Sequence, residues 1–309
     1  MKYINIFYLL LILIIICLIK LTYNEPFQNN DNENENENEN EIQCFYLSTL
    51  GYKRSFSNTP NILFHKLDDV SNFVVPNNKF ILVTAWGDSS MPSDSSKKAD
   101  EILNSPNCIR WFSQNIDASH PKLTAIPIGL DYHTIADGKI EPWWGEKETP
   151  VVQEKFIINL EKPPFEERKL NIYCNFKNSI RGRFGEKDRK TSLIQIPQDL
   201  LIIENEKITR KKTWKNMTKY AFVLSPHGNG LDCHRTWEAL VLGCIPIVKK
   251  SSLDILYEVL PVLIVDNWSD INKEMLQNTI DNYSKAEFNY DKLTLKYWIN
   301  LITSYRDEI

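Results

Sequence analysis

The sequence predicts an α/β fold with parallel sheets in two halves, and two observations carry this prediction. In the second half, strand-like apolar segments alternate with helix-like segments at short spacing, which is typical of repeated β-α units with right-handed crossovers. In the first half, β-branched and aromatic segments are bounded by Gly, Pro, Ser and Asp, which is typical of buried strands. The 309 residues are enough for one large domain or for two ordinary ones.

The predicted elements follow the apolar segments along the chain. In the first half they are strands at residues 79–86, 108–115 and 122–130. In the second half they are strands at residues 170–176, 220–226, 244–250 and 262–266, helices at residues 233–242 and 253–260, and a helical tail after Trp268. Pro and charged residues gather at 141–165, which indicates a boundary between a first domain over residues 42–165 and a second domain over residues 166–309.

The N-terminal segment predicts a membrane anchor. Residues 4–19 are apolar apart from Asn5, which is about the minimum length for a bilayer span. No small-x-small site follows, which favours an uncleaved signal anchor over residues 1–23 rather than a cleaved signal peptide. The Asn/Glu alternation within residues 24–41 predicts a flexible stalk. We therefore expect a single-pass type II protein whose body is lumenal, as in the endoplasmic reticulum or Golgi, or extracellular.

Composition excludes some partners and leaves others open. A net charge of −4 and a pI near 5.8 argue against a protein that binds nucleic acid mainly through its phosphates. None of the six cysteines has the spacing of a zinc site, so we interpret them as structural thiols.

The segment "SPHGNGLDCHRTWEAL", residues 225–240, suits a nucleotide diphosphate. Gly228 and Gly230 permit a positive φ and a close approach of the backbone to a ligand. Asp232 is expected to cap a helix whose start, with Arg235, would meet the phosphates, and Glu238 would accept hydrogen bonds from ribose hydroxyls. The competing interpretation is a tight loop with a cap and a surface Arg–Glu pair. A dinucleotide fingerprint is excluded, because its third glycine would fall at Cys233.

A basic loop follows the first strand of the second half. It forms either a solvated charged turn or a set of cations at the carboxyl end of that strand, where ligands of parallel sheets bind. Its cations are Arg181, Arg183, Lys187, Arg189 and Lys190.

Residues 221–270 resemble the donor-binding half of exostosin-like glycosyltransferases, in which a glycine loop, an Arg and a Glu at a helix start and a "GCIPI" strand recur in this order. "HPKLTAIPIGLDYHT" and "NIYCNFKNSIRGR" are also similar to relatives of that family, and the likeness covers about half of the chain. It implies the GT-B architecture, in which two Rossmann-like domains face each other across a cleft and the second binds a nucleotide sugar. The implied donor-binding residues are Arg181, Arg183, Gly228, Asn229, Gly230, Asp232, Arg235 and Glu238.

The resemblance also implies transfer of a sugar from the nucleotide-sugar donor to a glycan or glycoprotein acceptor, with inversion expected. No D-x-D motif is present to chelate a metal, so we expect no metal and no cofactor beyond the nucleotide sugar as co-substrate. The alternative is a catalytically silent sugar- or nucleotide-binding scaffold on the same fold. A nucleotide-dependent enzyme of another reaction type is disfavoured by the missing Walker and dinucleotide fingerprints.

An inverting transfer needs a general base, which we expect in the first domain. Asp88, Asp131 and His133 follow predicted strands and are the catalytic candidates. Loop caps for the two aspartates and a packed ring for His133 are the alternatives. His227 and His234, which flank the glycine loop, are rival candidates for the base.

Overall fold

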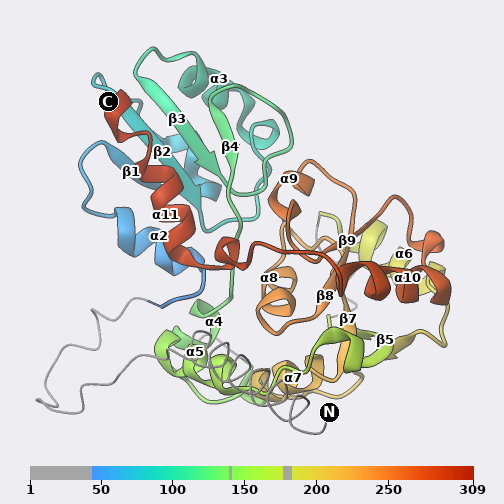
Figure 1. Cartoon of the computed structure of the whole chain (residues 1–309). Coiled ribbons are helices and arrows are strands. Elements are labelled where there is room, and N and C mark those ends of the chain that lie inside the picture. The colour runs from blue at the N-terminus through green and yellow to red at the C-terminus, as the bar shows by residue number, and fades with distance from the viewer. Residues whose placement is uncertain (1–43, 139–140, 177–182) are drawn as a thin grey trace, which may run out of the picture. The chain divides into compact units, whose positions relative to one another are not determined.

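The computed structural model describes residues 44–138, 141–176 and 183–309, which belong to one unit of the chain (Figure 1). The predicted anchor and stalk lie outside the described residues. Among the helices that the structure describes, none is long and apolar enough to cross a membrane. The predicted α/β class is confirmed, since the unit contains two sheets of parallel strands.

The first sheet has its four parallel strands in the order of the sequence: β1 (Ile62–Lys66), β2 (Phe80–Ala85), β3 (Cys108–Ser113) and β4 (Leu123–Ala125). Every residue of β2 is buried, as its apolar sequence predicts. Helices α2 (Thr49–Phe56) and α3 (Ser96–Asn104) belong to this half. β4 is shorter than the predicted strand over 122–130, because Pro127 has no N–H to donate and Gly129 turns the chain with a φ of +68°.

The second sheet has five parallel strands in the order β6-β5-β7-β8-β9. They are β5 (Lys169–Cys174), β6 (Leu201–Ile203), β7 (Tyr220–Leu224), β8 (Ile245–Lys249) and β9 (Leu263–Val265). Its helices are α6 (Thr191–Gln195), α7 (Arg210–Met217), α8 (His234–Val241), α9 (Asp254–Tyr257) and α10 (Lys273–Tyr283). The four strands and the helix at 233–242 predicted here are confirmed, whereas the helix predicted at 253–260 is the single turn α9.

The strand order reverses at β5. The chain goes from β5 to β6 on one side and then returns past β5 to β7 on the other side, so β5 lies between them. In open parallel sheets, ligands bind in the crevice outside the carboxyl ends of the strands at such a reversal. The fold therefore places a binding crevice after Cys174 and Leu224.

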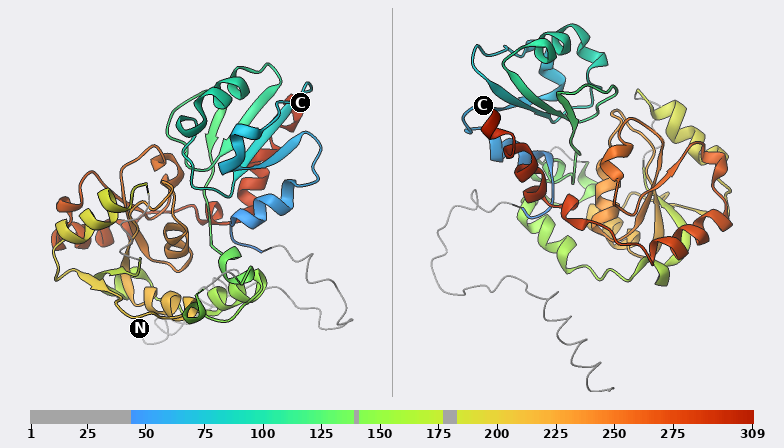
Figure 2. Two further views of the ribbon diagram at one scale, coloured as in Figure 1. Left: turned by 180° about the vertical axis from the view of Figure 1, so that it is seen from behind. Right: turned by 45° about the horizontal axis from the view of Figure 1, so that its top comes forward.

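The chain crosses between the halves twice. The first crossing runs through α4 (His133–Ala136), η3 (Pro142–Trp144), α5 (Pro150–Asn159) and η4 (Phe165–Glu167). The second follows α10 and ends in α11 (Leu295–Thr303), which lies beside α2 (Figures 1 and 2). Leu47 N donates to Leu293 O and Leu295 N to Phe45 O, each at 3.0 Å. The helical tail, predicted within the second domain, thus ends on the first sheet.

Buried apolar side chains join the two halves. The larger core cluster contains Trp111 and Phe112 of β3 together with Trp214 and Trp237 from α7 and α8. Cys44, Cys108, Cys174 and Cys244 are buried free thiols, and burial raises the pKa of Cys108 and of Cys174 to about 11, which fits the structural role predicted for them.

Candidate functional site

A cleft of about 730 Å³ lies at the carboxyl ends of β5, β6 and β7 and is lined by residues of both halves. Most of the predicted site residues meet in it. The ones that line it are Asp88, Asp131, Gly228, Asn229, Gly230, Asp232, Arg235 and Glu238. His234 also lines it, whereas His133 and His227 do not belong to its lining.

The glycines of the loop are needed for close packing. Neither Gly228 nor Gly230 uses the positive φ that glycine permits. A Cβ atom on Gly228 would lie 2.6 Å from Arg189 Nη2, and one on Gly230 would lie 2.7 Å from Asn115 Nδ2. Side chains from the basic loop and from the first half therefore occupy the space that a larger residue would fill.

Asp232 joins the glycine loop to the first half. The predicted N-cap role is wrong, because α8 begins at His234 with Cys233 as its N-cap and without a side-chain cap bond. The Asp232 carboxylate accepts hydrogen bonds from Ile128 N at 2.7 Å and from Trp237 Nε1 at 2.9 Å. Burial raises the pKa of this carboxyl to about 6.

The guanidinium groups of Arg235 and Arg189 lie close together beside the glycine loop. Arg235 Nε donates to Asn175 Oδ1 at 3.0 Å, which places the guanidinium at the end of β5. The guanidinium carbons of Arg235 and Arg189 lie 5.2 and 5.8 Å from the centre of the Phe176 ring. Among the side chains that the structure describes, no carboxylate pairs with either arginine, and Arg235 Nη1 and Arg189 Nε have no hydrogen-bond partner. Two unneutralised guanidiniums at one place suit an anionic ligand.

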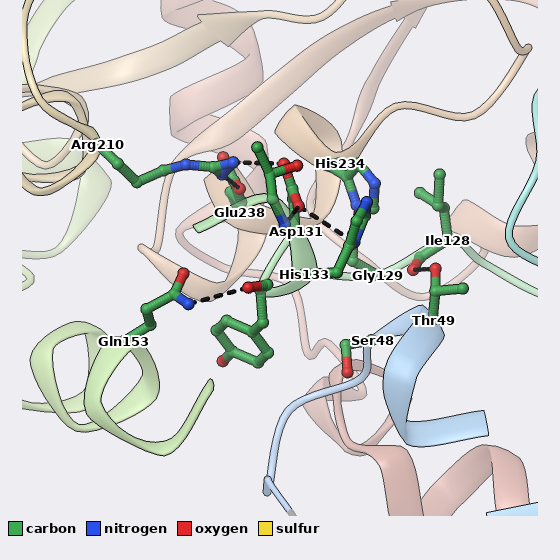
Figure 3. A network of polar contacts seen from close by, with 12 residues as sticks. Ser48, Thr49, Ile128, Gly129, Asp131, His133, Gln153, Arg210, His234 and Glu238 are labelled. Carbon is green, nitrogen blue, oxygen red and sulfur yellow. Dashed lines mark hydrogen bonds and ion pairs between the residues drawn. The ribbon is translucent and has the colours of Figure 1, made fainter. Parts of the chain in front are cut away.

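Glu238 pairs with Arg210 rather than with Arg235. Arg210 begins α7 and forms ion pairs with Glu238 of the second half and Asp131 of the first (Figure 3). All three side chains are buried, with 5–6% of each residue exposed. Burial alone would raise the pKa of the Asp131 carboxyl, but the charge of the Arg210 guanidinium outweighs it and holds this pKa well below its usual range.

Two imidazole rings stand beside Asp131 (Figure 3). His133 Nδ1 lies 3.2 Å from Asp131 Oδ1, and the centres of the His133 and His234 rings are 5.5 Å apart. Burial lowers the pKa of His133, which favours its neutral form. His234 Nδ1 lies 2.7 Å from Gly129 O. Because a carbonyl oxygen only accepts, Nδ1 carries the proton, and Nε2 of the neutral ring keeps a lone pair.

Asp131, His133 and His234 are the group of described residues that could hold a metal. Their ligand atoms all lie within 4.8 Å of one another. Arg210 already binds one oxygen of Asp131, and Thr134 N donates to the other at 3.0 Å. A dication here would have to compete with the Arg210 guanidinium for the carboxylate.

The remaining predicted residues have simpler surroundings. Asp88 is exposed at the cleft, and its backbone N–H donates to Asp68 Oδ1 at 2.9 Å. Arg183 forms an exposed ion pair with Asp94 and does not line the cleft. Arg181 lies outside the described residues. His227 Nδ1 lies 2.7 Å from Leu231 O, so this ring braces the glycine loop.

Sequence reasoning missed Arg210, which makes both buried ion pairs of the site. It opens the segment "RKKTWKNM", in which it looks like one more cation of an exposed helix. Only its place directly after Thr209, the N-cap, distinguishes it from its neighbours. The two tryptophans of η3 also line the cleft, although the sequence places them in the segment predicted as a domain boundary.

Comparisons with known proteins add no family to these observations. No protein-family model matches the chain, and no curated protein matches it significantly. The likeness of residues 221–270 to exostosin-like glycosyltransferases thus stays a prediction, and the function has to be argued from the cleft.

Proposed function

We propose that the protein is a glycosyltransferase of GT-B architecture that moves a sugar from a nucleotide-sugar donor to a glycan or glycoprotein acceptor. The observation that carries the proposal is the crevice at the strand reversal, where Asn175, the glycine loop and Arg235 meet at the ends of β5 and β7. Asp88 and Asp131 line the same cleft from the first half, so an acceptor could bind on the side opposite the donor. The N-terminal segment would anchor this catalytic body to a membrane.

The donor would bind to the second half. Arg235 and Arg189 would neutralise the diphosphate, with the glycine loop beside it. Glu238 lies one helical turn after Arg235 and would accept a hydrogen bond from a ribose hydroxyl. Arg210 pairs with this carboxylate and holds it in place.

The base would be His234, with Asp131 and His133 beside it. Asp131 is ionised but bonded to Arg210, so it has little basicity left for an acceptor proton. His234 lines the cleft and presents Nε2 with its lone pair. A base on the acceptor's side of the sugar would act in a direct displacement, which inverts the anomeric centre. Asp88 is the other cleft carboxylate that could take this role.

Replacing Arg235 with alanine should weaken donor binding by about 1.5–3 kcal/mol, the usual contribution of a hydrogen bond to a charged group. Calorimetry of the full-length chain across a panel of nucleotide sugars identifies the donor and then measures this loss. Arg183→Ala is the matched control, because it removes an arginine outside the cleft. Equal donor affinity in Arg235→Ala and the native protein would remove Arg235 from the site. Donor binding without transfer to any acceptor would favour a silent scaffold instead.

Treatment with EDTA should leave the transfer rate within about twofold of the untreated rate, because the charge of the leaving diphosphate is met by arginines rather than by a metal. The measurement is the initial rate before and after chelation, with Mn²⁺, Mg²⁺ and Zn²⁺ added back separately. Loss of activity that one of these ions restores would show that Asp131, His133 and His234 hold a metal after all.

A further inference from the structure

Two neighbouring tryptophans line the cleft next to Arg210. Trp143 and Trp144 belong to η3, and both are half-buried. The guanidinium carbon of Arg210 lies 4.7 Å from the centre of the Trp144 ring, and Lys207 Nζ lies 5.6 Å from the centre of the Trp143 ring. Although they precede the second sheet in the chain, these indoles therefore stand at the carboxyl ends of its strands.

A polar loop borders the same part of the cleft. It follows β6, and its lining residues include Glu204, Asn205 and Glu206. Glu204 Oε2 accepts from Tyr173 OH at 3.3 Å and from Asn216 Nδ2 at 3.1 Å, so its carboxylate has a fixed orientation. An aromatic platform with oriented acceptors and an amide beside it suits a flat heterocycle that has a polar edge.

The contacts along the cleft suggest where the phosphates, the ribose and the base of a nucleoside diphosphate would lie. Arg235 and Glu238 are one helical turn apart on α8, Glu238 pairs with Arg210, and Arg210 packs on Trp144. A nucleoside diphosphate presents phosphates, ribose and base in that order. With the phosphates at Arg235 and the ribose at Glu238, the base reaches Trp144.

We propose that Trp143 and Trp144 form the nucleobase site of the donor, with the loop Glu204–Glu206 at the polar edge of the base. This inference rests on the proposed function and deepens it. Arg210 packs on the Trp144 ring and holds it in place, and the base would stack on this indole where it lines the cleft. Stacking tolerates any base, so the choice between bases falls to the loop after β6.

The test is calorimetry of the full-length chain with UDP, GDP, CDP and ADP, and with inorganic pyrophosphate as a probe that has no base. Trp144→Ala should weaken the best-binding nucleoside diphosphate by about 5- to 150-fold, the loss that corresponds to one stacked base. Pyrophosphate should bind both proteins equally, and Trp144→Phe should keep most of the affinity. Trp143→Ala is the second variant, and the unfolding transition of each variant shows whether its fold is intact.

The outcomes separate this inference from the proposed function. If the native protein binds no nucleoside diphosphate, both fail. If it binds one and transfers its sugar while both tryptophan variants keep the native affinity, only the nucleobase site is wrong. A higher KM for the acceptor at unchanged nucleotide affinity would likewise overturn it and would assign the indoles to an acceptor sugar ring.

Discussion

Arg210→Ala is expected to lower the free energy of unfolding by about 3–5 kcal/mol, the cost of leaving buried charges without their partner. The substitution leaves the carboxylates of Asp131 and Glu238 without their cation, and each of these residues has at most 6% of its surface exposed. Chemical denaturation of the native protein and the variant at neutral pH measures the difference.

Lys211→Ala is the matched control for this prediction. Lys211 is the next residue of α7 and pairs with Glu148, but its side chain is 39% exposed, so its loss should cost no more than about 1 kcal/mol. Equal stabilities of the two variants would show that the buried network contributes little.

The pH dependence of stability gives a second check of the Arg210 network. Because the folded pKa of Asp131 is depressed, its contribution is present above the ordinary pKa of 3.8 and is lost as pH falls towards the folded pKa. Arg210→Ala should lack that part of the acid dependence.

His234→Ala is expected to reduce turnover by about 10²- to 10⁴-fold while the donor affinity stays at the native level. The reason is that the ring would take the acceptor's proton but makes no proposed contact with the donor phosphates. Steady-state rates, together with calorimetric donor affinity for the same preparation, measure both quantities.

His65→Ala is the control, because His65 lies on β1 and bonds Asp69 O outside the cleft lining. Asp131→Asn, His133→Ala and Asp88→Ala are measured in parallel. Native turnover in His234→Ala with a large loss in Asp88→Ala would move the base to Asp88. A loss of turnover in His133→Ala alone would give that role to the ring beside Asp131.

The sequence predicts the segment from β7 to β8 well because each of these elements is encoded locally. β7, α8 and β8 are each a short segment with one periodicity, separated by glycines and polar residues. The glycine loop and Arg235 therefore fall where strand and helix meet, and their place in the cleft follows from the parallel order.

What could not be predicted depends on contacts between distant residues. Arg210 meets Asp131 across 79 positions of the chain and Glu238 across 28, and nothing near Arg210 marks it for burial. A side chain at position 230 would clash with Asn115, which comes from the first half, so this position needs glycine. Asp232 looks like a helix cap, yet its carboxylate binds Ile128 N from the other half. In each case the role of the residue is set by tertiary packing and differs from the role that the local sequence pattern suggests.

The return of α11 to the first sheet has a consequence for the order in which the chain folds during synthesis. Leu295, Trp298 and Ile302 of α11 are buried, and Tyr46 forms a β-bridge with Thr294. Residues 169–265, by contrast, contain every strand of the second sheet. Domains usually fold from the N-terminus as they leave the ribosome. Here the half that emerges first lacks α11 until residues 295–303 are made, which is after every strand of the second sheet, so the second half can fold first while the first sheet still lacks this helix.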